Sequence, residues 1–136
     1  MEEPSLRDLL MTLELPPVAA STRAARHELL PLLEDVFTAD ERDVAALLVS
    51  ELVANAILHA DAPIAFTATL TPKLLRVDVC DASTSLPRLR EPDAHSQDGW
   101  GLCVVSELAS RWGAEATNDG KRVWFELDRL STPGNG

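Results

Sequence analysis

A long apolar segment in the first half of the chain constrains the fold more than any other feature. Across residues 44–60 nearly every side chain is apolar, and the exceptions are Ser50, Glu51, Asn55 and His59. A helix that is apolar almost all round is normally buried. Glu51, Asn55 and His59 are four residues apart, so a helix places them in one polar stripe along a single side.

A buried polar stripe needs compensating interactions. Burying a neutral amide without a partner costs roughly 2–7 kcal/mol, and burying a charge costs more. A bound polar ligand or a metal ion would supply these interactions, which makes the stripe the first candidate for a functional site. The structural alternatives are an Asn55 amide bonded to the backbone and a Glu51 carboxylate paired with an arginine.

Size and composition indicate a single globular domain. A chain of 136 residues buries about two thirds of its unfolded surface on folding. The chain is 46% hydrophobic, but its aromatic residues are only three Trp and three Phe, so aliphatic side chains must fill most of the core. We expect a tail at residues 1–10, a folded domain at 11–128 and a disordered tail at 129–136.

Charge and cysteine usage exclude several classes of function. The net charge is −10 and no run of Lys or Arg is present, which argues against direct nucleic-acid binding and is compatible with a basic protein partner. The start of the chain has no signal-peptide pattern, and no apolar run reaches the roughly 20 residues of a membrane span. We therefore expect a cytoplasmic protein without a membrane partner. Cys80 and Cys103 lack metal-ligand spacing, and we interpret them as small buried hydrophobes.

The first half of the chain predicts one strand followed by two helices. Residues 11–15 alternate apolar and polar and are stopped by two prolines, as expected of a strand. Ser21 or Thr22 can cap a helix that runs to about residue 33, with Pro31 interrupting or ending it. The T-x-x-E spacing at residues 38–41 is that of a capping box and opens the central helix, about 40–60.

The second half predicts two hairpins separated by a loop and a helix. Strands are expected at 64–70 and 74–80, a long lid-like loop at 82–98, a helix at 102–112 and strands at 114–118 and 122–127. This order indicates an α+β two-layer sandwich, in which about three helices cover one face of a mixed, mostly antiparallel sheet.

Four motifs in this order resemble the GHKL ATPase superfamily, and within it the small anti-sigma-factor serine kinases. The resemblance covers nearly the whole chain, about residues 13–127. Its motifs are Glu51-Leu-Val-Ala-Asn55-Ala-Ile-Leu-His59-Ala60, Val77-Asp-Val-Cys-Asp81, Gly99-Trp-Gly101-Leu102, and Gly120-Lys121-Arg-Val-Trp-Phe-Glu-Leu127. One of these motifs alone is weak evidence, whereas four in sequence at suitable spacing are strong evidence.

The resemblance implies a role for each motif. Asn55 would coordinate Mg²⁺ through its amide oxygen, and Glu51 would be the general base that takes a proton from a partner's Ser or Thr hydroxyl. Asp81 would accept a hydrogen bond from the adenine amino group of ATP. The nucleotide phosphates would lie against the segment that holds Gly99, Gly101 and Leu102, where backbone N–H groups and a helix N-terminus face them.

The sequence departs from the family pattern at two positions. The usual motif after the adenine-binding Asp is Asp-x-Gly, whereas Ser83 stands here and could supply a hydroxyl to the nucleotide. Relatives often carry Thr where this chain has Arg122, and Lys121 beside it is a candidate phosphate contact. The loop 85–98 would be the ATP lid, with Arg88 and Arg90 as either phosphate contacts or solvated charges.

The resemblance thus implies an ATP- and Mg²⁺-dependent serine/threonine protein kinase. It would bind a sigma factor and phosphorylate an anti-sigma-factor antagonist, and relatives commonly form homodimers. The alternative is a non-catalytic, partner-switching module that binds nucleotide or has lost it, which the changes at Ser83 and Arg122 favour.

Overall fold

The computed structural model describes residues 9–59, 63–82, 98–118 and 120–129, and the side chains of residues 9, 59 and 98–102 are not described. Within these described ranges, five strands and three helices follow each other along the chain. Their bounds are β1 Leu9–Leu15, α1 Ala20–Leu33, α2 Ala39–His59, β2 Ile64–Leu70, β3 Leu74–Asp81, α3 Asp98–Leu108, β4 Arg111–Thr117 and β5 Gly120–Asp128.

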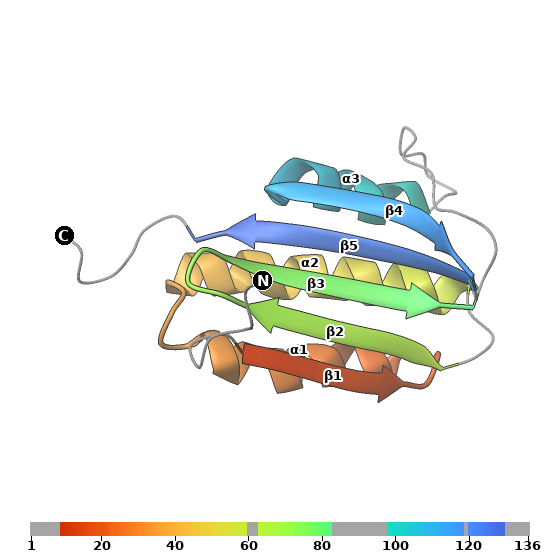
Figure 1. Cartoon of the computed structure of the whole chain (residues 1–136), viewed down its shortest axis with the longest axis horizontal. Helices are drawn as coiled ribbons and strands as arrows, with labels where there is room; N and C mark the ends of the chain where they lie inside the picture. Colours follow the sequence, from red (N-terminus) through yellow and green to blue (C-terminus); the bar gives the residue numbers. More distant parts are fainter. Residues whose placement is uncertain (1–8, 60–62, 83–97, 119, 130–136) are drawn as a thin grey trace.

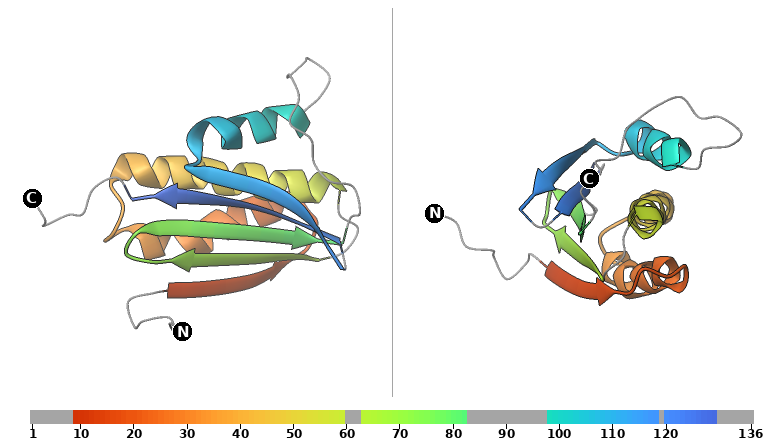
Figure 2. Two further views of the ribbon diagram at one scale, coloured as in Figure 1. Left: turned by 45° about the horizontal axis from the view of Figure 1, so that its top comes forward. Right: turned by 90° about the vertical axis from the view of Figure 1, so that its right-hand side faces the viewer.

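The strands form one sheet whose helices all lie on the same face (Figures 1 and 2). The strand order is β1-β2-β3-β5-β4, and each neighbouring pair is antiparallel. The predicted α+β two-layer fold is confirmed, with a sheet that is antiparallel throughout the described strands. Strand β5 lies between β3 and β4. The chain therefore passes from β3 through α3 to the edge strand β4, and then returns in β5 to pair with β3.

Helix α2 is buried because it is surrounded by other elements. It packs between α1 and α3, and it also contacts β3 and β5 beneath it. Leu48, Val49, Leu52 and Val53 are at most 1% exposed. The alternating burial along β3 and β5 turns every second side chain toward this helix. The apolar character of α2 on several sides is therefore explained by these neighbouring elements.

The capping box at the start of α2 is present as predicted. The Glu41 backbone N–H donates to Thr38 Oγ1 at 3.1 Å, and the Thr38 N–H donates to Glu41 Oε1 at 2.8 Å. The predicted cap of α1 is wrong, since that helix begins at Ala20 without a side-chain cap. The Ser21 hydroxyl instead donates to the Pro16 carbonyl at 2.6 Å and ties the helix to the end of β1.

The last helix and the strand after it begin earlier than the sequence indicates. Helix α3 starts at Asp98 and ends at Leu108, so that Trp112 belongs to β4 rather than to the helix. Pairing explains the change, because Trp112 lies opposite Phe125 and Gly113 lies opposite Trp124 in the β4–β5 ladder. Tertiary pairing here overrides the helical pattern.

The uncovered face of the sheet carries charged residues that pair with one another. Arg76 pairs with Asp78 at 2.9 Å and with Glu126 at 3.1 Å, and it lies 4.3 Å from the centre of the Trp124 ring. Arg111 on β4 pairs with Glu126 at 2.6 Å, and this contact together with Arg76 holds the pKa of Glu126 below its ordinary value. The polar face thus needs no helical cover. Among the described helices, none combines the length and apolar character of a membrane span.

Removing the capping box should destabilise the fold measurably. We expect Thr38→Ala to lower the free energy of unfolding by about 1 kcal/mol, because the Glu41 N–H loses its acceptor at the helix start. Urea unfolding measures this change. Thr22→Ala is the matched control, since Thr22 lies in the first turn of α1 without a side-chain cap bond. Equal effects of the two substitutions would contradict the assignment.

Candidate functional site

Four segments that carry the sequence motifs meet at one end of the molecule. The C-terminal half of α2, the end of β3, the start of β5 and the start of α3 all lie there (Figures 1 and 2). The strand register supports this arrangement, because Asp81 at the end of β3 lies opposite Lys121 at the start of β5. The tertiary fold therefore brings together residues that are up to 70 positions apart in sequence.

Asn55 is a buried polar residue on the site side of α2. The residue is 4% exposed, and its Oδ1 atom accepts no hydrogen bond from the residues that the structure describes. A buried acceptor without a donor costs about 1–3 kcal/mol. A neutral amide oxygen suits Mg²⁺, which takes few ligands from a protein and the rest from water and substrate phosphates. Asn55 therefore fits the metal that the sequence implies.

Glu51 lies one helical turn before Asn55. The carboxylate is half-buried, and burial raises its pKa above the ordinary value of 4.5. No hydrogen bond or ion pair with a described residue engages it. The neighbouring Ser50 is held more firmly, because its hydroxyl accepts from Arg26 Nη1 at 2.6 Å and donates to the Ala46 carbonyl at 2.8 Å. A raised pKa brings a carboxylate closer to the range useful for general base catalysis.

Asp81 is buried at the end of β3, on the face of the sheet that the helices cover. The residue is 7% exposed, and the alternation along β3 places it on the same side as Val77 and Val79. Gly120 packs directly against it: a Cβ atom at Gly120 would lie 1.9 Å from the Asp81 carbonyl oxygen and 2.6 Å from Cα of Ala82. The absence of a side chain at Gly120 allows this close approach and fixes the strand end.

Lys121 is fully buried beside Asp81. Its side chain is 0% exposed, and its Nζ atom lies 3.8 Å from Asp81 Oδ2. The sequence motif indicates Lys121 as a candidate phosphate contact, whereas the structure pairs it with Asp81. The strand pattern indicates that Lys121 is buried, because Lys121, Val123 and Phe125 occupy every second position and therefore share one face. A lysine in that series faces the core and requires an acidic partner.

Arg122 lies on the opposite face of the sheet. It pairs with Glu115 on β4 at 3.0 Å, and contact with the Cys80 thiol raises the pKa of its guanidinium. A shallow pocket of about 300 Å³ lies at this end of β3 and β5. Its lining includes Arg122, Cys80 and Asp81. Because Arg122 points away from α2, its departure from the family pattern does not alter the covered face.

Other predicted site residues are placed only in part. Ser83, Arg88 and Arg90 lie outside the described residues, as does most of the lid-like loop. Gly99, Gly101 and Leu102 lie in the first turns of α3, whereas the sequence placed the two glycines before the helix. The helix thus begins one residue before the Gly-x-Gly segment.

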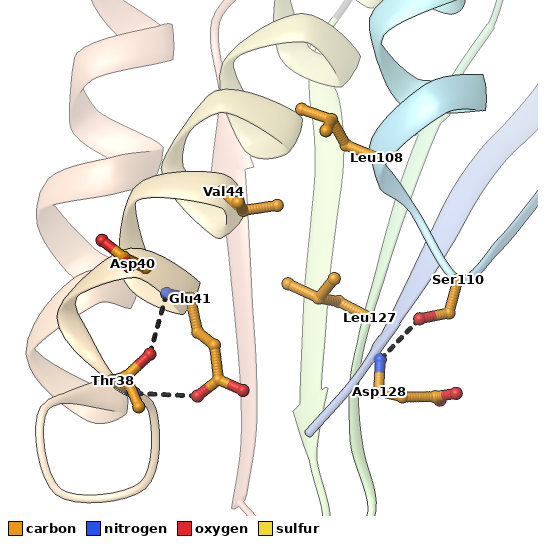
Figure 3. Close-up of a pocket in the computed structure, with 8 residues that line it drawn as sticks. All are labelled: Thr38, Asp40, Glu41, Val44, Leu108, Ser110, Leu127 and Asp128. Carbon is orange, nitrogen blue, oxygen red and sulfur yellow. Dashed lines mark hydrogen bonds between the residues drawn. The ribbon is translucent and has the colours of Figure 1, made fainter. Parts of the chain in front are cut away.

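A larger pocket lies at the other end of α2, where the helix begins (Figure 3). Its volume is about 450 Å³, and its lining residues are Thr38, Asp40, Glu41, Val44, Leu108, Ser110, Leu127 and Asp128. Thr38 and Glu41 form the capping box, and the Asp128 carboxylate pairs with Arg111. The Ser110 hydroxyl accepts from the Asp128 N–H at 2.9 Å. Hydrogen bonds and ion pairs within the protein therefore engage most of the polar groups that line this pocket.

Comparisons with known proteins identify the family and the fold. Residues 15–127 match the family described as "Histidine kinase-like ATPase domain". A similar solved structure contains the RsbU and RsbW domains of Rv1364c from Mycobacterium tuberculosis, with a TM-score of 0.70 and 21% identity. The match covers 92% of this chain and 33% of that chain, so the present chain spans about a third of the longer protein. No curated protein sequence matches the chain.

The close packing of Gly120 on Asp81 predicts a sharp substitution effect. We expect Gly120→Ala to lower the free energy of unfolding by about 2–3 kcal/mol, because the added Cβ meets backbone atoms that cannot move aside. Gly113→Ala is the matched control in the same hairpin, since its Cβ would meet the movable Trp124 ring at 2.9 Å. Urea unfolding should give a loss below about 1 kcal/mol for this control. Equal losses would contradict the predicted packing.

Proposed function

The chain belongs to the histidine kinase-like ATPase family, and we propose that it is a cytoplasmic, ATP- and Mg²⁺-dependent serine/threonine protein kinase and anti-sigma factor. Its substrate would be an anti-sigma-factor antagonist, and its second partner a sigma factor. The observation that supports this proposal most directly is the pair Glu51 and Asn55 on α2. One is a carboxylate with a raised pKa, and the other is a buried amide whose oxygen has no donor among the described residues.

The binding of ATP would use residues from three elements. The adenine amino group would donate to Asp81 at the end of β3, and the phosphates would lie near the start of α3 at Gly99 and Gly101. Helix N-termini favour phosphates because their N–H groups are free and the helix dipole is positive there. Mg²⁺ held by Asn55 and the phosphates would neutralise charge on the transferred group. Ser83, two residues after Asp81 in the sequence, would supply a hydroxyl to the nucleotide.

Glu51 would carry the proton transfer. As the partner's Ser or Thr oxygen attacks the γ-phosphorus, the hydroxyl proton passes to the Glu51 carboxylate. The bond between the γ-phosphorus and the β–γ bridging oxygen breaks, and ADP leaves with that oxygen. The product is a phosphorylated side chain on the partner. Positioning and electrostatics supply most of the remaining rate enhancement in phosphoryl transfer.

Charge and family resemblance support the choice of partners. The net charge of −10 favours association with a basic segment of another protein. The resemblance of the four motifs to anti-sigma-factor kinases supplies the sigma factor and the antagonist. A non-catalytic module that switches partners in response to nucleotide is the second candidate, and it is favoured by Ser83 in place of the usual glycine.

The first prediction concerns nucleotide binding. We expect Asn55→Ala to weaken Mg²⁺-ATP binding by roughly 10–100-fold, because a ligand interaction with a charged group is lost. Calorimetric titration measures the affinity. Leu47→Ala is the control on the same helix, because Leu47 is 41% exposed and lies two turns away from Asn55. Undetectable binding by the wild type at millimolar ATP would refute the proposed nucleotide site.

The second prediction separates binding from transfer. We expect Glu51→Gln to bind Mg²⁺-ATP as the wild type does and to transfer phosphate roughly 10²–10⁴-fold more slowly, because general base catalysis is lost. Since burial raises the pKa of Glu51 above 4.5, wild-type transfer should fall as pH drops through that raised value. The rate of phosphate incorporation into the antagonist, measured at several pH values, tests the slower transfer by the variant and the pH dependence of the wild type. ATP binding without any transfer by the wild type would favour the non-catalytic module.

A further inference from the structure

We propose that Lys121 is a specificity-determining, positioning residue that holds the Asp81 carboxylate ionised in a buried site. Asp81 then acts only as a hydrogen-bond acceptor, so the site selects nucleotides with a 6-amino purine over those with a 6-oxo purine. This inference rests on the proposed function, because it assumes that the base lies against Asp81. It assigns Lys121 a role toward the base rather than toward the phosphates.

The strand register and burial place the two side chains together. Asp81 and Lys121 are direct partners in the antiparallel β3–β5 pair, and both face the side of the sheet that α2 covers. Their side chains are 1% and 0% exposed, and Asp81 Oδ2 lies 3.8 Å from Lys121 Nζ. Gly120 brings the start of β5 against the Asp81 backbone, which restricts how far the two strands can separate.

Burial makes this pairing decisive for the protonation of Asp81. A carboxylate removed from water tends to take up a proton unless a cation or several donors compensate for the lost hydration. Lys121 is the cation on the strand that pairs with Asp81. Among the described charged residues of the neighbouring elements, Glu51 lies in the C-terminal half of α2, whereas Arg76, Asp78, Glu115, Arg122 and Glu126 lie on the opposite face of the sheet. Among the described residues, Lys121 is the cation that pairs with Asp81 on the covered face.

The protonation state determines which base the carboxyl can read. An ionised carboxylate accepts hydrogen bonds and has no proton to donate. It therefore pairs with the 6-amino group of adenine and repels the 6-oxo group of hypoxanthine. A protonated carboxyl carries an O–H group that would donate a hydrogen bond to the 6-oxo group. Discrimination between ATP and inosine triphosphate thus reports on the charge of Asp81.

A direct role of Lys121 toward phosphate is less consistent with the geometry. An ammonium that binds phosphate from solvent should be exposed at the mouth of the site, yet the Lys121 side chain is fully buried. Its Nζ atom lies 3.8 Å from Asp81 Oδ2. The lysine is thus placed to act through Asp81.

The test is the substitution Lys121→Met in the full chain. Met is similar in length and lacks the charge, so it removes the cation with little change in volume. The affinities for Mg²⁺-ATP and Mg²⁺-inosine triphosphate are measured by calorimetry between pH 5.5 and 8.5. Lys73→Met is the matched control, because Lys73 is the other lysine of the chain and lies exposed in the β2–β3 turn.

The proposal predicts a specific change in these profiles. Wild type and Lys73→Met should prefer ATP at least tenfold at every pH. Lys121→Met should lose this preference at the acid end and recover ATP affinity as pH rises, because its buried carboxyl is then protonated at low pH and ionised at high pH. In ligand-free protein, the ¹³C carboxyl signal of Asp81, assigned with Asp81→Asn, should titrate at higher pH in Lys121→Met than in the wild type.

Other outcomes overturn one proposal or the other. An unchanged ATP preference and an unchanged Asp81 titration in Lys121→Met would refute the role of Lys121 alone. Wild-type affinity for ATP in Asp81→Asn, or no nucleotide binding by the wild type, would refute the proposed nucleotide site. If Lys121→Met does not fold, the double variant Lys121→Met with Asp81→Asn should fold and show no ATP preference. If this double variant also fails to fold, Lys121 is required for packing, and the proposed role toward Asp81 is refuted.

Discussion

The burial of α2 is the constraint on which the rest of the structure depends. The helix is enclosed by α1, α3 and the sheet, so its apolar side chains form the centre of the core. A polar residue on such a helix must be compensated or used. Asn55 has an uncompensated oxygen within the described residues, and Glu51 has a raised pKa. The same burial that stabilises the fold thus gives both groups the properties on which the proposed function rests.

The sheet contributes the other half of the site through its ladder. Asp81 and Lys121 meet because β5 lies beside β3, although β4 and α3 separate these strands from each other along the chain. The charges of the uncovered face are paired among themselves by Arg76 and Arg111, which leaves the helix-covered face to hold the site. Among the described residues, the uncovered face therefore carries solvent-facing ion pairs, and the covered face carries the buried pair of Asp81 and Lys121.

Sequence patterns predicted the elements whose signals are local. The T-x-x-E capping box fixed the start of α2, and the alternation in residues 64–70 and 74–80 matched β2 and nearly all of β3. The start of α1 and both ends of α3 were misplaced. Ser21 found a better partner in the Pro16 carbonyl, and Trp112 was drawn into the sheet by its pairing with Phe125. In both cases a contact outside the helix outweighed the helical preference.

The sequence by itself determined that a buried helix carries Glu51 and Asn55 on one side, because the four-residue spacing and the apolar surroundings are local properties. It also determined which strand positions face the core. Only the tertiary structure decided that Lys121 lies against Asp81 and that Arg122 turns to the opposite face. These contacts depend on which strands become neighbours. That choice is made by the packing of the whole sheet on its helices rather than by any short segment.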